Sequence, residues 1–210
     1  MKLFYSTATS STVTHILLRE AGIPFNGVEV SWSRNLNVEE LNKANRLGTV
    51  PALITDDGKL LTQNTAIIEY IADLKPNSSL LPKAGTFERA TAISWIAFAA
   101  SDLQRAFGPV LGAKRLTTNE VAQNELREGG IAKIKTFLEH VEFHLTGKDY
   151  ILGKEFSGAD IPLFVFIGWT KWAEIKTAPY KNISAFMKRI YNRPAVKSVL
   201  EAEELDFSQD

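Results

Sequence analysis

The first third of the chain alternates between short apolar runs and segments with helical spacing. The run "KLFY" at residues 2–5 predicts a buried strand, and Val13, Ile16 and Leu17 then recur on one helix face. "NGVEVSW" predicts a second strand and "NVEELNKAN" a short helix. Asp57-Gly58 in "TVPALITDDGKLLT" indicates a hairpin, and "NTAIIEYIADL" follows as an amphipathic helix. The order βαβαββα predicts a small mixed sheet with a parallel core and an antiparallel edge hairpin.

This pattern breaks at "KPNSSLLPKAGT", residues 75–86, where prolines, serines and a glycine predict a linker. Beyond it the spacing is helical almost throughout. We expect one long helix over residues 87–115 that weakens near Gly108-Pro109, and a second over 119–145 with an irregularity at Gly129-Gly130. The fold class is therefore α/β plus all-α. The expected boundaries are an α/β domain at 1–76, a linker at 77–86 and an all-helical domain at 87–210.

Composition narrows the function classes. The 210 residues include 24 Lys and Arg against 24 Asp and Glu, so charge gives no case for nucleic acid or membrane as a partner. With no cysteine, disulfides, thiolate metal sites and a protein thiol nucleophile are excluded. No apolar run is long enough for a secretory signal or a membrane span. We expect a cytoplasmic enzyme or binding protein.

Pro51 in "TVPAL" starts a predicted strand, where proline's missing N–H is tolerated. A trans bond is the ordinary interpretation. A cis Val50-Pro51 bond would instead turn the Val50 backbone outward, so that an extended peptide-like ligand pairs with it as an added strand.

Gln63 and Asn64 stand at the start of a predicted helix. Asn64 is expected to cap that helix. The free N–H groups and positive dipole end of the helix would also suit a carboxylate ligand.

Ser10 and Ser11 form a second polar pair, at the start of the first predicted helix, which follows the first predicted strand. They either cap the helix or hold a reactive group.

Other candidate motifs favour structure over chemistry. "FSGAD" places Ser157 as an N-cap with Asp160 three residues later, and Phe156 and Ile161 as a hydrophobic staple. His140 and His144 have a metal-binding spacing, but no third ligand is evident, and a solvated helix face is the favoured interpretation. We expect His15 to be packed within the first helix. The phosphate-binding glycine motifs and the GxSxG elbow are absent.

Taken together, these motifs resemble the cytosolic glutathione transferase superfamily, most closely its bacterial beta class. The resemblance runs along nearly the whole chain. It is carried by "MKLFY", "SSTVTHILLREAGIPF", "NRLGTVPALITDDGKLLTQNTAIIEYIADL", "FSGADIPLF" and "AFMKRIYNRPAV". It implies a thioredoxin-like N-terminal domain that binds glutathione, a helical domain that shapes the electrophile site, a homodimer, and a cis bond before Pro51.

The resemblance also implies roles for individual residues. Val50, flanked by Thr49 and Pro51, would pair its backbone with the cysteinyl part of glutathione, and Gln63 and Asn64 would hold its γ-glutamyl group. The remaining implied site residues are Asp102, reaching across the dimer, Gln104 and Arg105 in the long helix, and Trp169 in the electrophile pocket.

Four positions at three sites depart from the beta-class pattern. Ser10 replaces the class cysteine, Gln63 an acidic residue, and Gln104-Arg105 a His-Lys pair. The resemblance thus makes Ser10 the better candidate for the role of that cysteine and leaves the helix cap to Ser11. The tyrosine that matches Tyr5 is not usually the thiol activator in this class, so Tyr5 is expected to be a core residue.

The resemblance implies conjugation of glutathione, a co-substrate, to small hydrophobic electrophiles, with no cofactor or metal and with the thiolate stabilised by Ser10 or Ser11. Glutathione peroxidase-like chemistry stays open. The alternative, motivated by Gln63 and Gln104, is a binding or interaction protein with the same fold and weak or no catalysis.

Overall fold

The computed structural model describes residues 1–78 and 80–208. Its N-terminal part holds a four-stranded mixed sheet in the order β2-β1-β3-β4. The pair β1 and β2 is parallel, whereas β1 with β3 and β3 with β4 are antiparallel. The strands are β1 (Lys2–Tyr5), β2 (Asn26–Glu29), β3 (Ala52–Ile54) and β4 (Leu60–Thr62). The predicted sheet and edge hairpin are confirmed.

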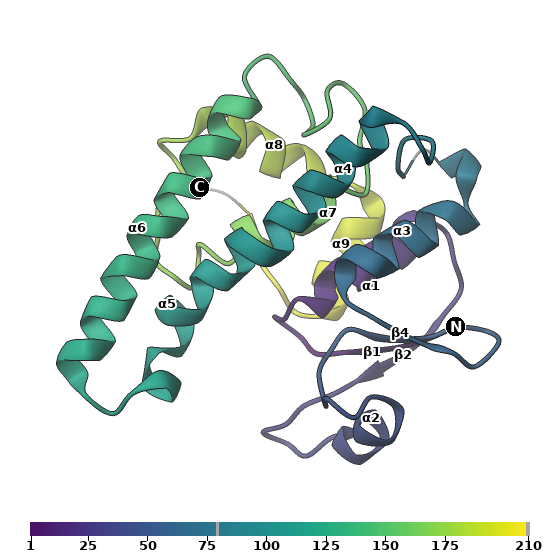
Figure 1. Cartoon of the computed structure of the whole chain (residues 1–210), viewed down its shortest axis with the longest axis horizontal. Helices are drawn as coiled ribbons and strands as arrows, with labels where there is room; N and C mark the ends of the chain where they lie inside the picture. Colours follow the sequence, from purple (N-terminus) through teal and green to yellow (C-terminus); the bar gives the residue numbers. More distant parts are fainter. Residues whose placement is uncertain (79, 209–210) are drawn as a thin grey trace.

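Helices cover both faces of this sheet (Figure 1). Leu3 and Leu53 face a core shared with α1 (Ser11–Glu20) and α3 (Asn64–Leu74). Phe4 and Ala52, one residue along each strand, pack in a smaller cluster with α2 (Val38–Ala44) on the other face. The alternation of side chains along each strand thus produces two layers of helix around one sheet.

The single long helix expected after the linker is divided into three consecutive helical segments. It consists of α4 (Phe87–Ala97), the π-helical segment η2 (Phe98–Leu103) and α5 (Gln104–Leu116). In η2 the N–H of Gln104 donates to the carbonyl of Ala99, five residues back. The helix continues through Gly108-Pro109, and the weakening predicted near this pair lies three residues later, at Gly112, which has non-helical torsion angles.

The predicted irregularity at Gly129-Gly130 is wrong, because α6 (Glu120–His144) continues through both glycines. Gly130 serves packing instead, whereas Gly129 has open space around it. A Cβ on Gly130 would lie 2.6 Å from Val110 Cγ2 and 3.2 Å from the Ala106 carbonyl oxygen, whereas one on Gly129 would meet nothing within 4 Å. Gly130 therefore allows α5 and α6 to lie close together as a two-helix arm (Figure 1).

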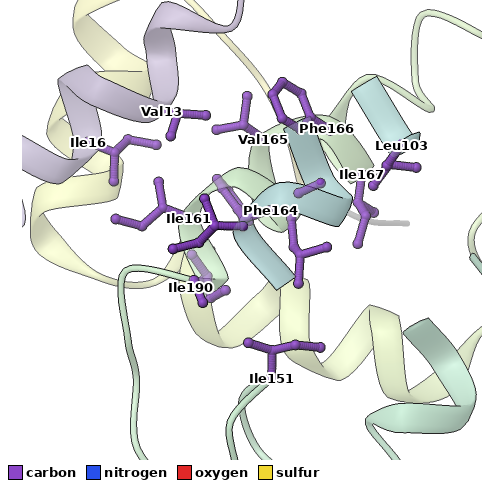
Figure 2. Close-up of a cluster of buried hydrophobic side chains, with 14 of the residues drawn as sticks. Val13, Ile16, Leu103, Ile151, Ile161, Phe164, Val165, Phe166, Ile167 and Ile190 are labelled. Atoms are coloured by element: carbon purple, nitrogen blue, oxygen red, sulfur yellow. The ribbon is translucent and has the colours of Figure 1, made fainter. Parts of the chain in front are cut away.

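The centre of the molecule is α7 (Asp160–Gly168), all of whose residues are buried. Figure 2 shows Val13 and Ile16 of α1 beside Val165 and Ile161 of α7, so that the core is continuous from the sheet layers into the helical part. The remaining helices are η1 (Pro76–Ser78), α8 (Lys181–Tyr191) and α9 (Pro194–Ala202). None of the described helices is long and apolar enough to cross a membrane. The domain boundaries at 76 and 87 stay a prediction.

In the "FSGAD" motif, Asp160 accepts the hydrogen bonds, and the expected N-cap Ser157 is one of its donors. Asp160 Oδ2 accepts from the Ser157 N–H at 2.7 Å and from the Ser157 hydroxyl at 2.9 Å, and its Oδ1 accepts from the Ile151 N–H at 2.7 Å. The Ser157 hydroxyl therefore donates to the acid rather than capping α7. Burial raises the pKa of Asp160 to about 6, against the lowering effect of these hydrogen bonds.

Helix α9 is tied to α1 at both ends by polar contacts. The Arg193 guanidinium donates to both carboxylate oxygens of Glu20, at 2.6 and 2.8 Å. At the other end, the fully buried Glu203 carboxylate accepts from the Thr12 hydroxyl at 2.8 Å and contacts His15 Nδ1 at 2.8 Å. The C-terminal helix thus fixes α1, whose first turn carries the serine pair.

Candidate functional site

The two serines at the start of α1 have different environments. Ser11 is fully buried, and its hydroxyl lies 3.0 Å from the Ser6 N–H, 3.2 Å from the Ser6 carbonyl and 2.7 Å from the Thr9 hydroxyl. This hydroxyl closes the loop of residues 6–11, in which Ala8 has a φ of +63°. Ser11 is the first residue of α1 and not its N-cap, so its assignment as the cap is wrong. Its hydroxyl is engaged by Ser6 and Thr9, and a role for Ser11 at the thiol stays a prediction.

Ser10 is the N-cap residue of α1, but its side chain makes no cap hydrogen bond. Its half-buried hydroxyl lies 3.5 Å from the Val50 carbonyl oxygen, too long for a strong hydrogen bond. Thr9 is the nearest capping side chain, since its hydroxyl accepts from the Ser11 N–H at 3.3 Å. Ser10 therefore keeps a hydroxyl that is free to turn toward a ligand.

The Val50-Pro51 bond is cis, as the resemblance implies. Pro51 is buried beneath the segment, and Val50 is half-buried at the entrance to β3. Asn45 holds the preceding turn, donating from its side-chain nitrogen to the Thr49 carbonyl at 2.8 Å. The Val50 backbone thus lies just before the N-terminal end of β3, beside Ser10, where an extended peptide could pair with it.

The polar pair at the mouth of α3 is arranged differently from the prediction. Gln63 is the N-cap, with an exposed side chain and torsion angles of φ 70° and ψ 119°. Asn64 is the first helical residue and is buried, so its assignment as the cap is wrong. Its side-chain nitrogen donates to the Ser10 carbonyl at 2.9 Å, and its Oδ1 accepts from the Thr14 hydroxyl at 2.8 Å.

The α3 N-terminus also offers backbone donors. The first carbonyl available to this helix is that of Gln63, which accepts from Ile67 at 3.0 Å. The N–H groups of residues 64–66 consequently have no intrahelical acceptor. Within 1–78 and 80–208 no other group accepts from them. This end of α3 suits an anion such as a carboxylate.

The residues expected in the long helix lie apart from this cluster. Asp102, on η2, accepts from the Ser101 hydroxyl at 2.7 Å, and Arg105 is exposed at the start of α5. Within the described parts of the chain, neither these two nor Gln104 hydrogen-bonds to Ser10, Val50, Gln63 or Asn64. Their roles toward a ligand stay predictions.

Trp169 follows α7 and packs among aromatic rings. Its centroid lies 5.0 Å from that of Phe166 and 5.7 Å from that of Phe107, and its buried Nε1 has no hydrogen-bond partner among the described residues. An electrophile pocket at Trp169 stays a prediction.

The histidines serve packing. His140 is exposed, as predicted, and stacks on Trp95 at a centroid distance of 5.2 Å. His144 is half-buried, lies tilted against the same ring at 4.4 Å, and its Nε2 is 2.9 Å from the Ile151 carbonyl oxygen. No cluster of three metal-ligating side chains occurs among the described residues.

Tyr5 and His15 belong to the core beneath the site. Their rings lie 4.8 Å apart, and the His15 side chain is 4% exposed. Burial raises the pKa of Tyr5, and the negative charges of Glu29 and Glu203 add to this effect. A phenol held in its neutral form here agrees with the structural role expected for Tyr5.

Thr9, Thr14 and Asn45 shape the site, although the sequence prediction passed over all three. Thr14 carried a signal, because a polar residue beside Val13 and Ile16 interrupts the apolar face of a helix. Asn45 carried a weaker one, three residues before the turn glycine Gly48 with its φ of +60°.

Comparison with known proteins places the chain in a family. Sequence models of the glutathione S-transferase N-terminal and C-terminal domains match residues 10–74 and 102–203. Glutathione S-transferase GstA of Escherichia coli O157:H7 is 34% identical over 98% of this chain and 100% of its own length.

Two solved structures agree with this match. A sphingomonad glutathione S-transferase complexed with glutathione and a bacterial beta-class enzyme from Sphingomonas chungbukensis each share 36% identity, with a TM-score of 0.87 over 98% of this chain and 100% of theirs. The chain therefore belongs to the glutathione S-transferase family, and bacterial beta-class enzymes are among its structural neighbours.

Proposed function

We propose that this glutathione transferase conjugates the thiol of glutathione to small hydrophobic electrophiles, with the Ser10 hydroxyl donating to the thiolate. One observation carries the assignment of Ser10. Its hydroxyl is half-buried at the start of α1, has only a 3.5 Å contact to the Val50 carbonyl, and lies beside the backbone before β3 with which a peptide would pair. The neighbouring Ser11 hydroxyl is enclosed.

The chemistry needs the thiolate, and an unperturbed thiol has a pKa of about 8.5. A hydroxyl that donates to sulfur favours the thiolate, as does the positive end of a helix. The sulfur then forms a bond to an electrophilic carbon, the leaving group departs with its bonding electrons, and the thiol proton passes to solvent. A mixed disulfide with the protein has no place here, because the chain lacks cysteine.

The rest of glutathione would extend from Ser10 along Val50 to the mouth of α3. The Val50 backbone, flanked by Thr49 and Pro51, would pair with the cysteinyl unit. The γ-glutamyl carboxylate would meet the free N–H groups of residues 64–66 and the exposed Gln63 side chain.

The same proposal includes a homodimer in which Asp102 reaches the neighbouring subunit's ligand. Sedimentation equilibrium of the pure protein measures the dimer directly, and a monomer at micromolar concentration would refute it.

Turnover of glutathione with a halogenated nitroarene tests the assignment of Ser10. We expect Ser10→Ala to lower kcat by at least about tenfold, the scale of one lost transition-state hydrogen bond. A Ser10→Ala variant that matches wild type would refute the role of Ser10. Ser11→Ala is the matched comparison, expected to act through stability instead.

A second candidate, a glutathione-binding or interaction protein without catalysis, is favoured by Gln63, which carries no charge at the α3 mouth. Retention on immobilised glutathione without turnover would support it. A lowered thiol pKa for bound glutathione, followed by thiolate absorbance against pH, would support the enzyme.

A further inference from the structure

The carboxamide of Asn64 points into the protein, away from the surface where a ligand would lie. It is 7% exposed, and both of its polar atoms have partners on α1. Its nitrogen donates to the Ser10 carbonyl at 2.9 Å and its oxygen accepts from the Thr14 hydroxyl at 2.8 Å. Ser10 and Thr14 are four residues apart, so Asn64 spans one turn of α1.

This arrangement leaves Asn64 little capacity to hold a ligand through its side chain. A neutral buried hydrogen bond of this kind contributes about 1 kcal/mol, and breaking either one leaves a buried polar group unpaired. The carboxylate donors at this helix mouth are then backbone N–H groups and Gln63 rather than the Asn64 carboxamide.

The bridge does act on Ser10. By fixing the Ser10 carbonyl, it fixes the peptide that joins Ser10 to Ser11, and the Ser11 hydroxyl anchors the other side of that peptide to Ser6. The Ser10 backbone is thereby held in place beside Val50, while its hydroxyl, with only the 3.5 Å contact to the Val50 carbonyl, can turn toward the sulfur. One side chain thus connects the mouth of α3, where the γ-glutamyl group would bind, with the residue at the thiol.

We propose that Asn64 is a positioning residue that sets the Ser10 hydroxyl against the glutathione sulfur, and that Thr14 is the second member of this device. This inference rests on the proposed function. It also accounts for the residue type, because the bridge needs one donor and one acceptor on a short, planar group. Aspartate would place an oxygen against the Ser10 carbonyl, and serine is too short to reach both partners.

Thr14→Val is the sharpest test, since it keeps the shape of a buried side chain behind Asn64 and removes only the hydroxyl. Asn64→Ala removes both arms of the bridge, and Thr136→Val on the exposed face of α6 is the control for a lost helix hydroxyl. We measure kcat, the KM for glutathione, and the pKa of the bound glutathione thiol by its absorbance.

The expected result is a kcat lowered about threefold to tenfold in Thr14→Val and about tenfold or more in Asn64→Ala, the range of one or two lost hydrogen bonds. The bound thiol pKa should rise in both variants, while the KM for glutathione changes less than about twofold because uniform binding is untouched. Thr136→Val should match wild type.

Two results would overturn the inference. A raised KM in Asn64→Ala with an unchanged thiol pKa makes Asn64 a ligand group, and wild-type kinetics in Thr14→Val make the bridge irrelevant. Ser10→Ala separates this from the proposed function. If it loses turnover while the Asn64 and Thr14 variants do not, only the inference fails. If it matches wild type, the role of Ser10 fails and the positioning role falls with it.

Discussion

Gly129 and Gly130 offer a matched pair of substitutions that tests how closely the two arm helices pack. Each Gly→Ala change adds a methyl group to the interior of α6 and removes the same backbone freedom, worth about 0.8–1.0 kcal/mol in favour of the helix. At Gly129 the new Cβ has open space, so we expect a gain of roughly that size in the free energy of unfolding.

At Gly130 the same Cβ lies 2.6 Å from Val110 Cγ2, 3.2 Å from the Ala106 carbonyl oxygen and 3.4 Å from Pro109 Cβ. The valine methyl must move, and the carbonyl belongs to the backbone of α5 and cannot. Overpacking of this kind costs about 1–3 kcal/mol, which cancels or exceeds the gain in propensity. We therefore expect Gly130→Ala to be about 1–3 kcal/mol less stable than Gly129→Ala.

Urea unfolding at one fixed protein concentration measures this difference, and the same free energy should lower the Tm by about 2–4 °C for each kcal/mol. Val110→Ala combined with Gly130→Ala should recover part of the loss, since it removes the nearer obstacle, and the double-mutant cycle gives the coupling. Equal stabilisation by Gly129→Ala and Gly130→Ala would refute the close approach of α5 and α6.

Two further predictions concern buried carboxylates. Glu203→Ala should lower the free energy of unfolding by about 3–5 kcal/mol, because it leaves the buried Thr12 hydroxyl and His15 without their partner. Glu203→Gln should cost less, and the exposed Glu204→Gln should cost almost nothing. A loss below about 0.5 kcal/mol in Glu203→Ala would contradict the role of Glu203 in joining α9 to α1. Asp160 has a folded pKa of about 6, above the ordinary value of roughly 3.9. The raised pKa therefore stabilises the folded protein below about pH 4, and this contribution is lost as pH rises through 6. The free energy of unfolding falls by roughly 3 kcal/mol over this range. Asp160→Asn should flatten that part of the stability profile in urea titrations, and an unchanged slope would contradict the raised pKa.

Most of the sheet and its helices could be predicted from sequence because their signals are local. Asp57-Gly58 marks its own hairpin, and the apolar spacing around Val13 and Ile16 marks its own helix. The π-helical segment escaped prediction because "FAASDL" is compatible with either hydrogen-bond pattern. Gly130 was misjudged because propensity reports only on its own helix, while the reason for the glycine lies on α5.

The candidate site shows the same division between local and distant information. Sequence placed Ser10, Val50 and Gln63 at three separate element boundaries, and the fold brings these boundaries together around the first turn of α1. It could not distinguish the adjacent Ser10 and Ser11, because the direction of each hydroxyl depends on the loop that Ser6 and Thr9 close. Nor could it show that Asn64 turns inward, since its partners Ser10 and Thr14 lie about fifty residues earlier in the chain.

The π-helical segment has a consequence for how chains of this family are compared. A hydrogen bond from Gln104 to Ala99 spans one residue more than an α-helical turn does, so the segment holds one extra residue within a continuous run of helix from α4 to α5. A relative with one residue fewer between positions 98 and 103 can therefore run as an uninterrupted α-helix and present the same sides before and after it. In an alignment of two such sequences, a single-residue gap inside this helix would then mark a true insertion. The residues after the gap would still correspond one to one between the two chains.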